Sequence, residues 1–144
     1  MQNPSICFFF EGVRPNLRAR TELKQFLVKL AMREGKRIEA INYIFTTDAR
    51  VLEINRAYLN HHDYTDIITF PLHVSGKAIS ADIYISTERV KENAATFSSS
   101  FKKELHRVVI HGLLHLCGYR DKSQKDQLQM RQLEDKYLRL YFHE

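Results

Sequence analysis

The chain has 144 residues, of which 44% are hydrophobic, enough for one compact domain with a core of its own. No apolar run approaches the roughly 20 residues needed to cross a bilayer, and the N-terminus lacks the pattern of a secretion signal. The formal net charge of +5 would favour a polyanion such as nucleic acid, although an ordinary basic surface explains it as well. We therefore expect a single domain over residues 1–144, without a membrane partner.

Cys7 and Cys117 are the two cysteines of the chain. They lie far apart in the sequence, and each stands among apolar residues. This favours two free thiols over a disulfide and indicates a reducing compartment. We expect a cytoplasmic protein.

Periodicity along the chain predicts four strands and five helices. β-Branched and aromatic residues fill the predicted strands, whereas apolar residues recur every three or four positions in the predicted helices. In chain order, the strands span residues 5–13, 39–47, 66–74 and 78–86, and the helices span residues 19–34, 48–60, 86–97 and 101–117, with a last helix starting at Ser123.

The order of these elements defines the expected fold class. The last two strands flank Ser75 and Gly76, a pair typical of the turn in an antiparallel hairpin. The strand–helix–strand units before them predict two crossover connections and therefore parallel strands. The sequence predicts an α+β fold with a small mixed four-stranded sheet, three mostly parallel strands plus an antiparallel one, packed with about five helices.

The run VVIHGLLHLCGYRDKSQ, residues 108–124, carries a candidate metal site. His111 and His115 are four residues apart, so their side chains lie one above the other on the same face of the predicted helix. Gly118 suits the left-handed conformation that ends a helix, and the turn can bring Asp121 back to the same point. The pattern predicts one divalent ion per chain, with zinc expected, held by His111, His115 and Asp121 and with one position open.

Three motifs then carry a family resemblance. HGLLHLCGYRD, residues 111–121, is similar to H-G-x-L-H-L-x-G-Y-D-H, and INRAYLNHHDYTDIITFP, residues 54–71, is similar to L-N-x-x-Y-R-x-x-x-x-P-T-D-V-L-S-F-P. ADIYIS, residues 81–86, is similar to G-D-I-x-I-S. These are the patterns of the YbeY family of metal-dependent endoribonucleases, the bacterial rRNA maturation factors, and they occur here in the family's order.

The resemblance implies a single-strand-specific, metal-dependent endoribonuclease that acts in rRNA maturation and ribosome quality control. The implied partners are single-stranded RNA, rRNA and the ribosome, and no DNA is expected. Two departures stand out: Asp121 replaces the family's third histidine, and Leu59 replaces an arginine expected to contact phosphate. Aspartate is a competent ligand. Arg56, or else His61 and His62, could supply the phosphate contact.

Two other functions remain open at this point. Zinc proteases with the pattern H-E-x-x-H-x-x-G-x-x-H use the glutamate beside the first histidine as general base. Gly112 occupies that position here, which favours the nuclease and would leave room for a phosphate beside the ion. Alternatively, the zinc is structural, with Cys117 as the nearby fourth ligand, and the protein only binds the ribosome. No general base can be named from the pattern.

Basic residues near the motif could follow an RNA backbone. They are Lys102, Lys103, Arg107, Arg120 and Lys122.

Overall fold

Four strands form one sheet in the order β1-β2-β4-β3 in the computed structural model, which describes residues 3–59 and 65–144. The helices and strands follow the predicted order, and most of their ends lie within two residues of the predicted positions. The elements are β1 (Ser5–Phe10), α1 (Arg20–Arg33), β2 (Arg37–Thr46), α2 (Asp48–Leu59), β3 (Ile67–Ser75), β4 (Ala78–Ser86), α3 (Thr87–Thr96), α4 (Phe101–Leu116) and α5 (Gln124–Phe142).

The strand directions confirm the expected mixed sheet. β1 pairs with β2 and β2 pairs with β4 in parallel, while β3 pairs with β4 in antiparallel register. The antiparallel strand is β3, so the helix before it, α2, does not connect two neighbouring parallel strands. Pro71 explains why β3 lies at the edge, because proline has no N–H to donate to a second neighbouring strand. β4 takes the interior place, and its Ile83 and Ile85 are fully buried.

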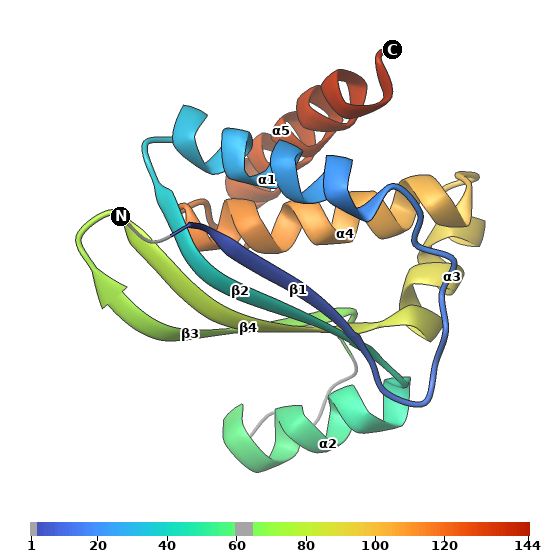
Figure 1. Cartoon of the computed structure of the whole chain (residues 1–144). Coiled ribbons are helices and arrows are strands. Elements are labelled where there is room, and N and C mark those ends of the chain that lie inside the picture. The colour runs from blue at the N-terminus through green and yellow to red at the C-terminus, as the bar shows by residue number, and fades with distance from the viewer. Residues whose placement is uncertain (1–2, 60–64) are drawn as a thin grey trace.

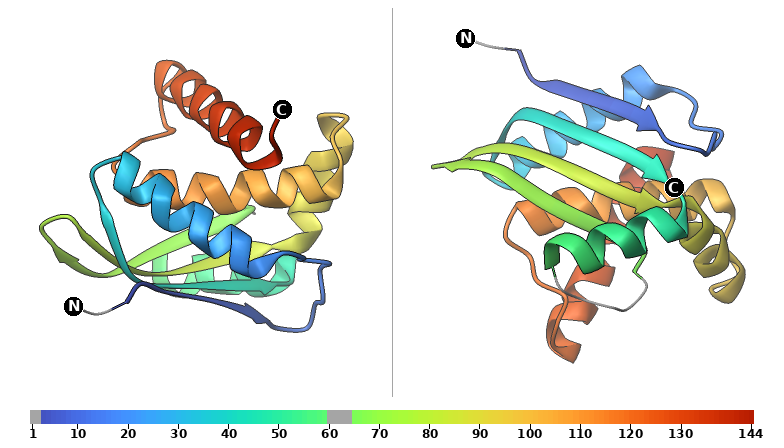
Figure 2. Two further views of the ribbon diagram at one scale, coloured as in Figure 1. Left: turned by 45° about the horizontal axis from the view of Figure 1, so that its top comes forward. Right: turned by 90° about the horizontal axis from the view of Figure 1, so that it is seen from below.

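Helices cover both faces of the sheet. Figure 1 shows α1 and α4 on one face and α2 on the other, and the right-hand view of Figure 2 shows α2 in front of the strands. The main core lies between the sheet and the first of these layers, where the Tyr43 hydroxyl donates to the Val109 carbonyl oxygen at 3.1 Å. No helix within the described ranges is long and apolar enough to cross a membrane.

Side-chain caps fix the starts of four helices. Thr47 Oγ1 accepts a hydrogen bond from the Arg50 backbone N–H at 3.2 Å. The hydroxyls of Ser86, Ser100 and Ser123 accept in the same way at the starts of α3, α4 and α5. Each cap satisfies an N–H that has no partner within its helix. The serine caps therefore set where the two helices that carry the candidate site, α4 and α5, begin.

Candidate active site

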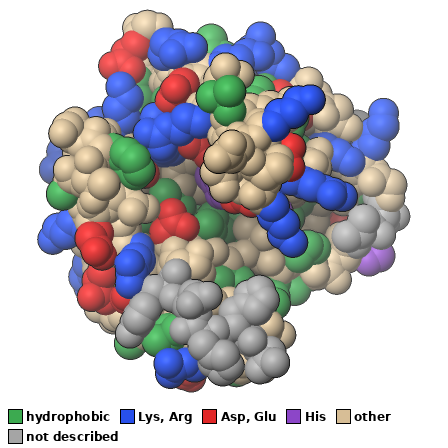
Figure 3. Space-filling view, turned by 180° about the vertical axis from the view of Figure 1, so that it is seen from behind, with side chains coloured by type: hydrophobic (Ala, Val, Ile, Leu, Met, Phe, Trp, Pro, Cys, Tyr) green, Lys and Arg blue, Asp and Glu red, His purple; other side chains and the backbone are tan. Residues whose placement is uncertain are grey.

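A cavity of about 480 Å³ lies between the first residues of β3 and the helices α3, α4 and α5. Figure 3 shows a hollow with histidine at its floor, carboxylates beside it, and lysine and arginine side chains around it. Most of the side chains that line the cavity are polar or charged. They are Thr65, Asp66, Ile67, Thr69, Asn93, Phe97, Glu104, Arg107, Val108, His111, His115, Asp121, Gln127, Met130, Arg131 and Glu134.

His111 is held from both ring nitrogens. Its Nδ1 lies 2.7 Å from Glu134 Oε2, and its Nε2 lies 3.2 Å from Asp121 Oδ2. Burial by itself would lower the pKa of His111, but the hydrogen bond to Glu134 and the charges of Glu134, Asp66 and Asp121 outweigh burial and raise it. The Nδ1–H donates to Glu134, so Nε2 is the nitrogen that faces Asp121.

The turn after α4 brings Asp121 to His111. Gly118 has a φ of +109°, in the region that favours glycine, and its N–H donates to the His115 carbonyl oxygen at 3.1 Å. The Tyr119 N–H donates to the Leu114 carbonyl oxygen at 3.2 Å. These two bonds end the helix and reverse the chain, which confirms the conformation predicted for Gly118.

His115 lines the same cavity but does not complete a cluster with the other two predicted ligands. Within residues 3–59 and 65–144, no three histidine, cysteine, aspartate or glutamate side chains are grouped to hold a metal ion. The structure therefore joins His111 to Asp121 and leaves His115 one turn along α4, facing the same space.

Gly112 does not leave room for a phosphate, so that expectation is wrong. A Cβ at Gly112 would lie 2.9 Å from Ile67 Cδ1 and 3.2 Å from Ile83 Cδ1. The missing side chain therefore allows α4 to pack closely against β3 and β4. The same contacts leave no space for the glutamate that a zinc protease carries at this position.

Glu134 is a site residue that the sequence analysis missed. It is 5% exposed and also accepts a hydrogen bond at Oε1 from Arg107 Nη1 at 3.1 Å. Arg107 Nη2 donates to Asp135 Oδ1 at 2.7 Å. A signal was available, because Glu134 shares the buried face of α5 with Met130 and Leu138, where an acidic residue is unusual. Arg107 is thus paired with two carboxylates and only 11% of its side chain is exposed, while a contact of Arg107 with an RNA backbone stays a prediction.

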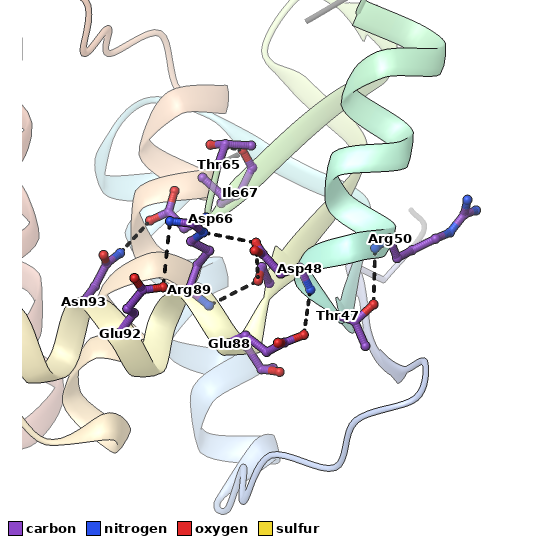
Figure 4. Close-up of polar contacts among 12 residues, drawn as sticks. Thr47, Asp48, Arg50, Thr65, Asp66, Ile67, Glu88, Arg89, Glu92 and Asn93 are labelled. Carbon is purple, nitrogen blue, oxygen red and sulfur yellow. Dashed lines mark hydrogen bonds and ion pairs between the residues drawn. The ribbon is translucent and has the colours of Figure 1, made fainter. Parts of the chain in front are cut away.

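Two further carboxyl groups line the cavity. Asp66 accepts a hydrogen bond at Oδ2 from Asn93 Nδ2 at 3.3 Å, as Figure 4 shows. Glu104 is 3% exposed, and its Oε2 has no hydrogen-bond donor in the described part of the chain. The closest cation to this oxygen is Arg107, whose Nε lies 3.7 Å away. Burial raises the pKa of both carboxyl groups.

The charges in the cavity suit a divalent cation. Four carboxyl groups and two guanidinium groups line it, so its formal charge is −2 when the carboxyl groups are ionised and the histidines are neutral. A divalent ion would cancel this charge. Neutral histidine nitrogen and carboxylate oxygen are also ligands that zinc accepts. The donor types present are therefore compatible with a metal cofactor, but in the described residues they are not grouped around one point.

The other predicted residues lie elsewhere. Arg56 is exposed on α2, across the sheet from α4, where it lines a separate hollow with Glu53. His61 and His62 fall outside the described residues. Cys117 is a free, half-buried thiol that packs against the core and does not line the cavity.

Fold and cavity together define a small mixed α+β protein with histidines and carboxylates gathered at one end of its sheet. A family model described as Endoribonuclease YbeY matches residues 14–141, and the chain belongs to this family. The resemblance stated from the three motifs is thus confirmed.

Individual relatives agree with the family assignment. The chain is 48% identical to the Endoribonuclease YbeY of Cytophaga hutchinsonii over 141 residues, which cover 97% of this chain and 98% of that protein. It is also 48% identical to the Endoribonuclease YbeY of Flavobacterium psychrophilum over 125 residues, 87% of this chain and 89% of that one. The solution structure of a Thermotoga maritima protein matches with a TM-score of 0.63 at 30% identity, covering 96% of this chain and 89% of that chain.

Proposed function

We propose that the chain is an endoribonuclease that cleaves single-stranded RNA in this cavity with the help of a bound divalent ion. Family membership supports the activity, and rRNA maturation in the cytoplasm is the setting we propose for it. The observation that carries the choice of site is the pair formed by His111 Nε2 and Asp121 Oδ2, which lie 3.2 Å apart in the lining of a polar cavity.

His111, His115 and Asp121 would hold the ion, which we propose to be zinc. When bound, such an ion polarises a phosphoryl oxygen and activates water for attack on phosphorus. His111 contributes through Nε2, because its Nδ1–H is engaged by Glu134. A histidine fixed in this way by a carboxylate keeps one tautomer and one ring orientation, which strengthens it as a ligand.

Arg107 holds the Glu134 carboxylate in the position from which it contacts His111. Its guanidinium joins Glu134 to Asp135, so the carboxylate that orients His111 is itself fixed on α5. Such an outer hydrogen-bonded layer holds ligating groups in place before any substrate arrives. We assign Glu134 and Arg107 as positioning residues.

Asp66 is the carboxylate we propose to accept a proton from the attacking water. Glu134 is engaged by Arg107 and His111, and Oε2 of Glu104 is completely covered. Asp66 faces the cavity and has a pKa that burial raises, which brings it closer to neutral pH. A base whose pKa lies nearer to the working pH is more effective in proton transfer.

The two alternative functions lose support from specific contacts. A peptidase of the usual zinc type needs a glutamate next to the first histidine, and Ile67 and Ile83 occupy the space around Gly112. A structural zinc with Cys117 as its fourth ligand loses support because Cys117 does not line the cavity. Both observations favour an enzyme that acts on RNA.

The test is a cleavage assay with the purified protein. A labelled single-stranded RNA and the duplex of the same sequence are incubated after treatment with a chelator and after zinc is restored. We expect zinc-dependent cleavage of the single strand only, its loss in His111→Ala, and its retention in His73→Ala, which changes an exposed histidine on β3. Chelator-sensitive cleavage of casein with intact RNA would instead establish a peptidase.

The cellular setting needs a separate experiment. Depletion of the protein in the organism that encodes it should cause rRNA precursors with unprocessed ends to accumulate. Complementation with the wild-type chain should remove them, whereas the His111→Ala variant should not. Normal rRNA ends after depletion would contradict the role in rRNA maturation while leaving the nuclease activity in place.

A further inference from the structure

Phe97 is an exposed aromatic residue that lines the same cavity. It follows the last turn of α3 and is 55% exposed, although α3 buries Val90 and Ala94 against the rest of the molecule. The ring is therefore available to contact an occupant of the cavity, and aromatic rings pack well against flat apolar surfaces.

Arg131 lies against this ring. Its guanidinium carbon is 5.0 Å from the centre of the Phe97 ring, and both side chains line the cavity, although they come from α5 and α3. A guanidinium beside an aromatic ring gives a combined planar and cationic surface. We name Phe97 and Arg131 the aromatic–arginine pair.

The aromatic–arginine pair lies close to the proposed reaction centre. Arg131 precedes Glu134 by three residues, so the two lie on one face of α5, about one helical turn apart. Glu134 in turn contacts His111 at 2.7 Å. A nucleotide whose phosphate lies at His111 could thus place a neighbouring base at Phe97.

We propose that the aromatic–arginine pair is a stacking platform for one unpaired base next to the phosphodiester that is cleaved. This rests on the proposed function and adds a contact to the substrate. Unpaired bases stack on aromatic rings and on guanidinium planes, and such stacking tolerates any base because every base has a flat face. A base within a duplex is already stacked and cannot enter, so the platform also accounts for a single-strand preference.

The chain provides its own fluorescence reporter for this contact. It contains no tryptophan, so Phe97→Trp places a single indole at the proposed platform and keeps a ring available for stacking. Phe9→Trp is the matched control, because Phe9 is 49% exposed on β1 and does not line the cavity. The probe is a 2′-O-methyl RNA single strand, and the titration is run with a chelator present, because the proposed water attack needs the metal ion and not a free 2′-hydroxyl.

We expect the single strand to quench the fluorescence of the Phe97→Trp variant and to leave that of the Phe9→Trp variant unchanged. An otherwise identical strand with abasic sugars should quench much less. Equal quenching by both strands, or no quenching while RNA still binds, would overturn the platform.

Binding and kinetics give an independent test. Phe97→Ala should weaken binding of the single strand by about five- to 150-fold, the range that corresponds to one lost base stack. Phe97→Tyr keeps an aromatic ring and should bind about as tightly as wild type. Arg131→Lys keeps the charge but loses the planar guanidinium group, so it should bind more weakly than wild type. Cleavage by Phe97→Ala should show a raised KM with kcat less affected.

The two hypotheses fail in different ways. If the wild-type protein neither binds nor cleaves RNA, the proposed function fails. If wild type does both and Phe97→Ala does so equally well, only the platform fails. Phe97 is mostly exposed, so the variant should fold, and an unchanged thermal unfolding midpoint checks this.

Discussion

Glu134 on α5 accepts a hydrogen bond from His111 on α4, with 2.7 Å between Oε2 and Nδ1. This hydrogen bond joins α4 to α5 through two residues that are 23 positions apart in the sequence. It leaves His111 Nε2 directed at Asp121. An ionised carboxylate has no proton to donate and can only accept a hydrogen bond. Glu134 therefore selects the His111 tautomer that carries its proton on Nδ1. The metal chemistry proposed for the cavity therefore depends on a residue that is not itself a ligand.

Removal of the Glu134 carboxylate should weaken metal binding. We expect Glu134→Ala to reduce zinc affinity by about 10- to 100-fold, the usual cost of losing such an outer hydrogen bond, measured by competition with a chromophoric chelator. Glu134→Gln keeps an acceptor oxygen and should lose less. Glu53→Ala is the control, because Glu53 is exposed on α2 and does not line the cavity. Equal zinc affinity in wild type and Glu134→Ala would show that the contact does not orient a ligand.

Asp121 is the residue at which this chain departs from the family pattern. If it is a ligand, Asp121→Asn should bind zinc more weakly, because an amide oxygen is a poorer donor than a carboxylate. Asp121→His would recreate the three-histidine set and should keep the ion. Asp126→Asn is the control, since Asp126 lies in the first turn of α5 outside the cavity. Identical zinc titrations for wild type and Asp121→Asn would mean that the third ligand lies elsewhere.

Asp66 should affect catalysis without affecting the metal. If it accepts the proton from water, Asp66→Asn should lower kcat by about 10²- to 10⁴-fold and leave zinc affinity unchanged. Asn93→Ala removes the donor to Asp66 Oδ2 and should have a smaller effect of the same kind. A parallel loss of zinc from Asp66→Asn would instead make Asp66 a ligand, and an unchanged kcat would remove it from the mechanism.

Local patterns were sufficient for part of this site. The spacing of His111 and His115 places both on one helix face, and Gly118 predicts the reversal that brings Asp121 back. Each of these inferences needs only the geometry of one helix and its C-terminal turn. The same reasoning predicted that the last helix starts at Ser123, because a helix start depends on residues within one turn.

Contacts between distant elements were not predictable in this way. The partnership of Glu134 with His111 depends on how α5 crosses α4, and periodicity within either helix does not give that angle. The function assigned to Gly112 was wrong for the same reason, because its neighbours Ile67 and Ile83 come from two strands of the sheet. The strand directions were likewise left open by the order of the elements, which does not say that β3, and not β4, is the antiparallel strand.

His106 should make the folded protein sensitive to acid. It is 2% exposed, its Nδ1–H donates to the Lys102 carbonyl oxygen at 2.7 Å, and burial lowers its pKa from the ordinary value of 6.5. The unfolded chain therefore takes up a proton at a higher pH than the folded chain does. As the pH falls below about 6.5, the free energy of unfolding should decrease, by at most about 1.4 kcal/mol per pH unit from this group.

Urea unfolding across this pH range measures the effect. His106→Asn keeps an N–H donor but replaces a buried ring, so its free energy of unfolding should be lower than that of wild type at neutral pH. Because asparagine does not titrate, this free energy should also vary less with pH. His73→Asn changes an exposed histidine and should leave the wild-type slope in place. The same slope in wild type and His106→Asn would assign the acid sensitivity to other groups.

Gly112→Ala tests the packing of α4 against the sheet. Alanine favours a helix by about 1 kcal/mol over glycine, but its Cβ would approach Ile67 Cδ1 to 2.9 Å. Overpacking of this kind typically costs about 1–3 kcal/mol, so we expect a net destabilisation of about 1 kcal/mol in urea unfolding.

Ile67→Val removes the atom at 2.9 Å and alone should cost about 0.5–1.5 kcal/mol. In the double variant the new methyl group fills the space left by Cδ1, so the combined loss should be smaller than the sum of the single losses. Strictly additive losses would show that α4 adjusts without pressing on Ile67, and the close approach would then not be the reason for glycine at this position.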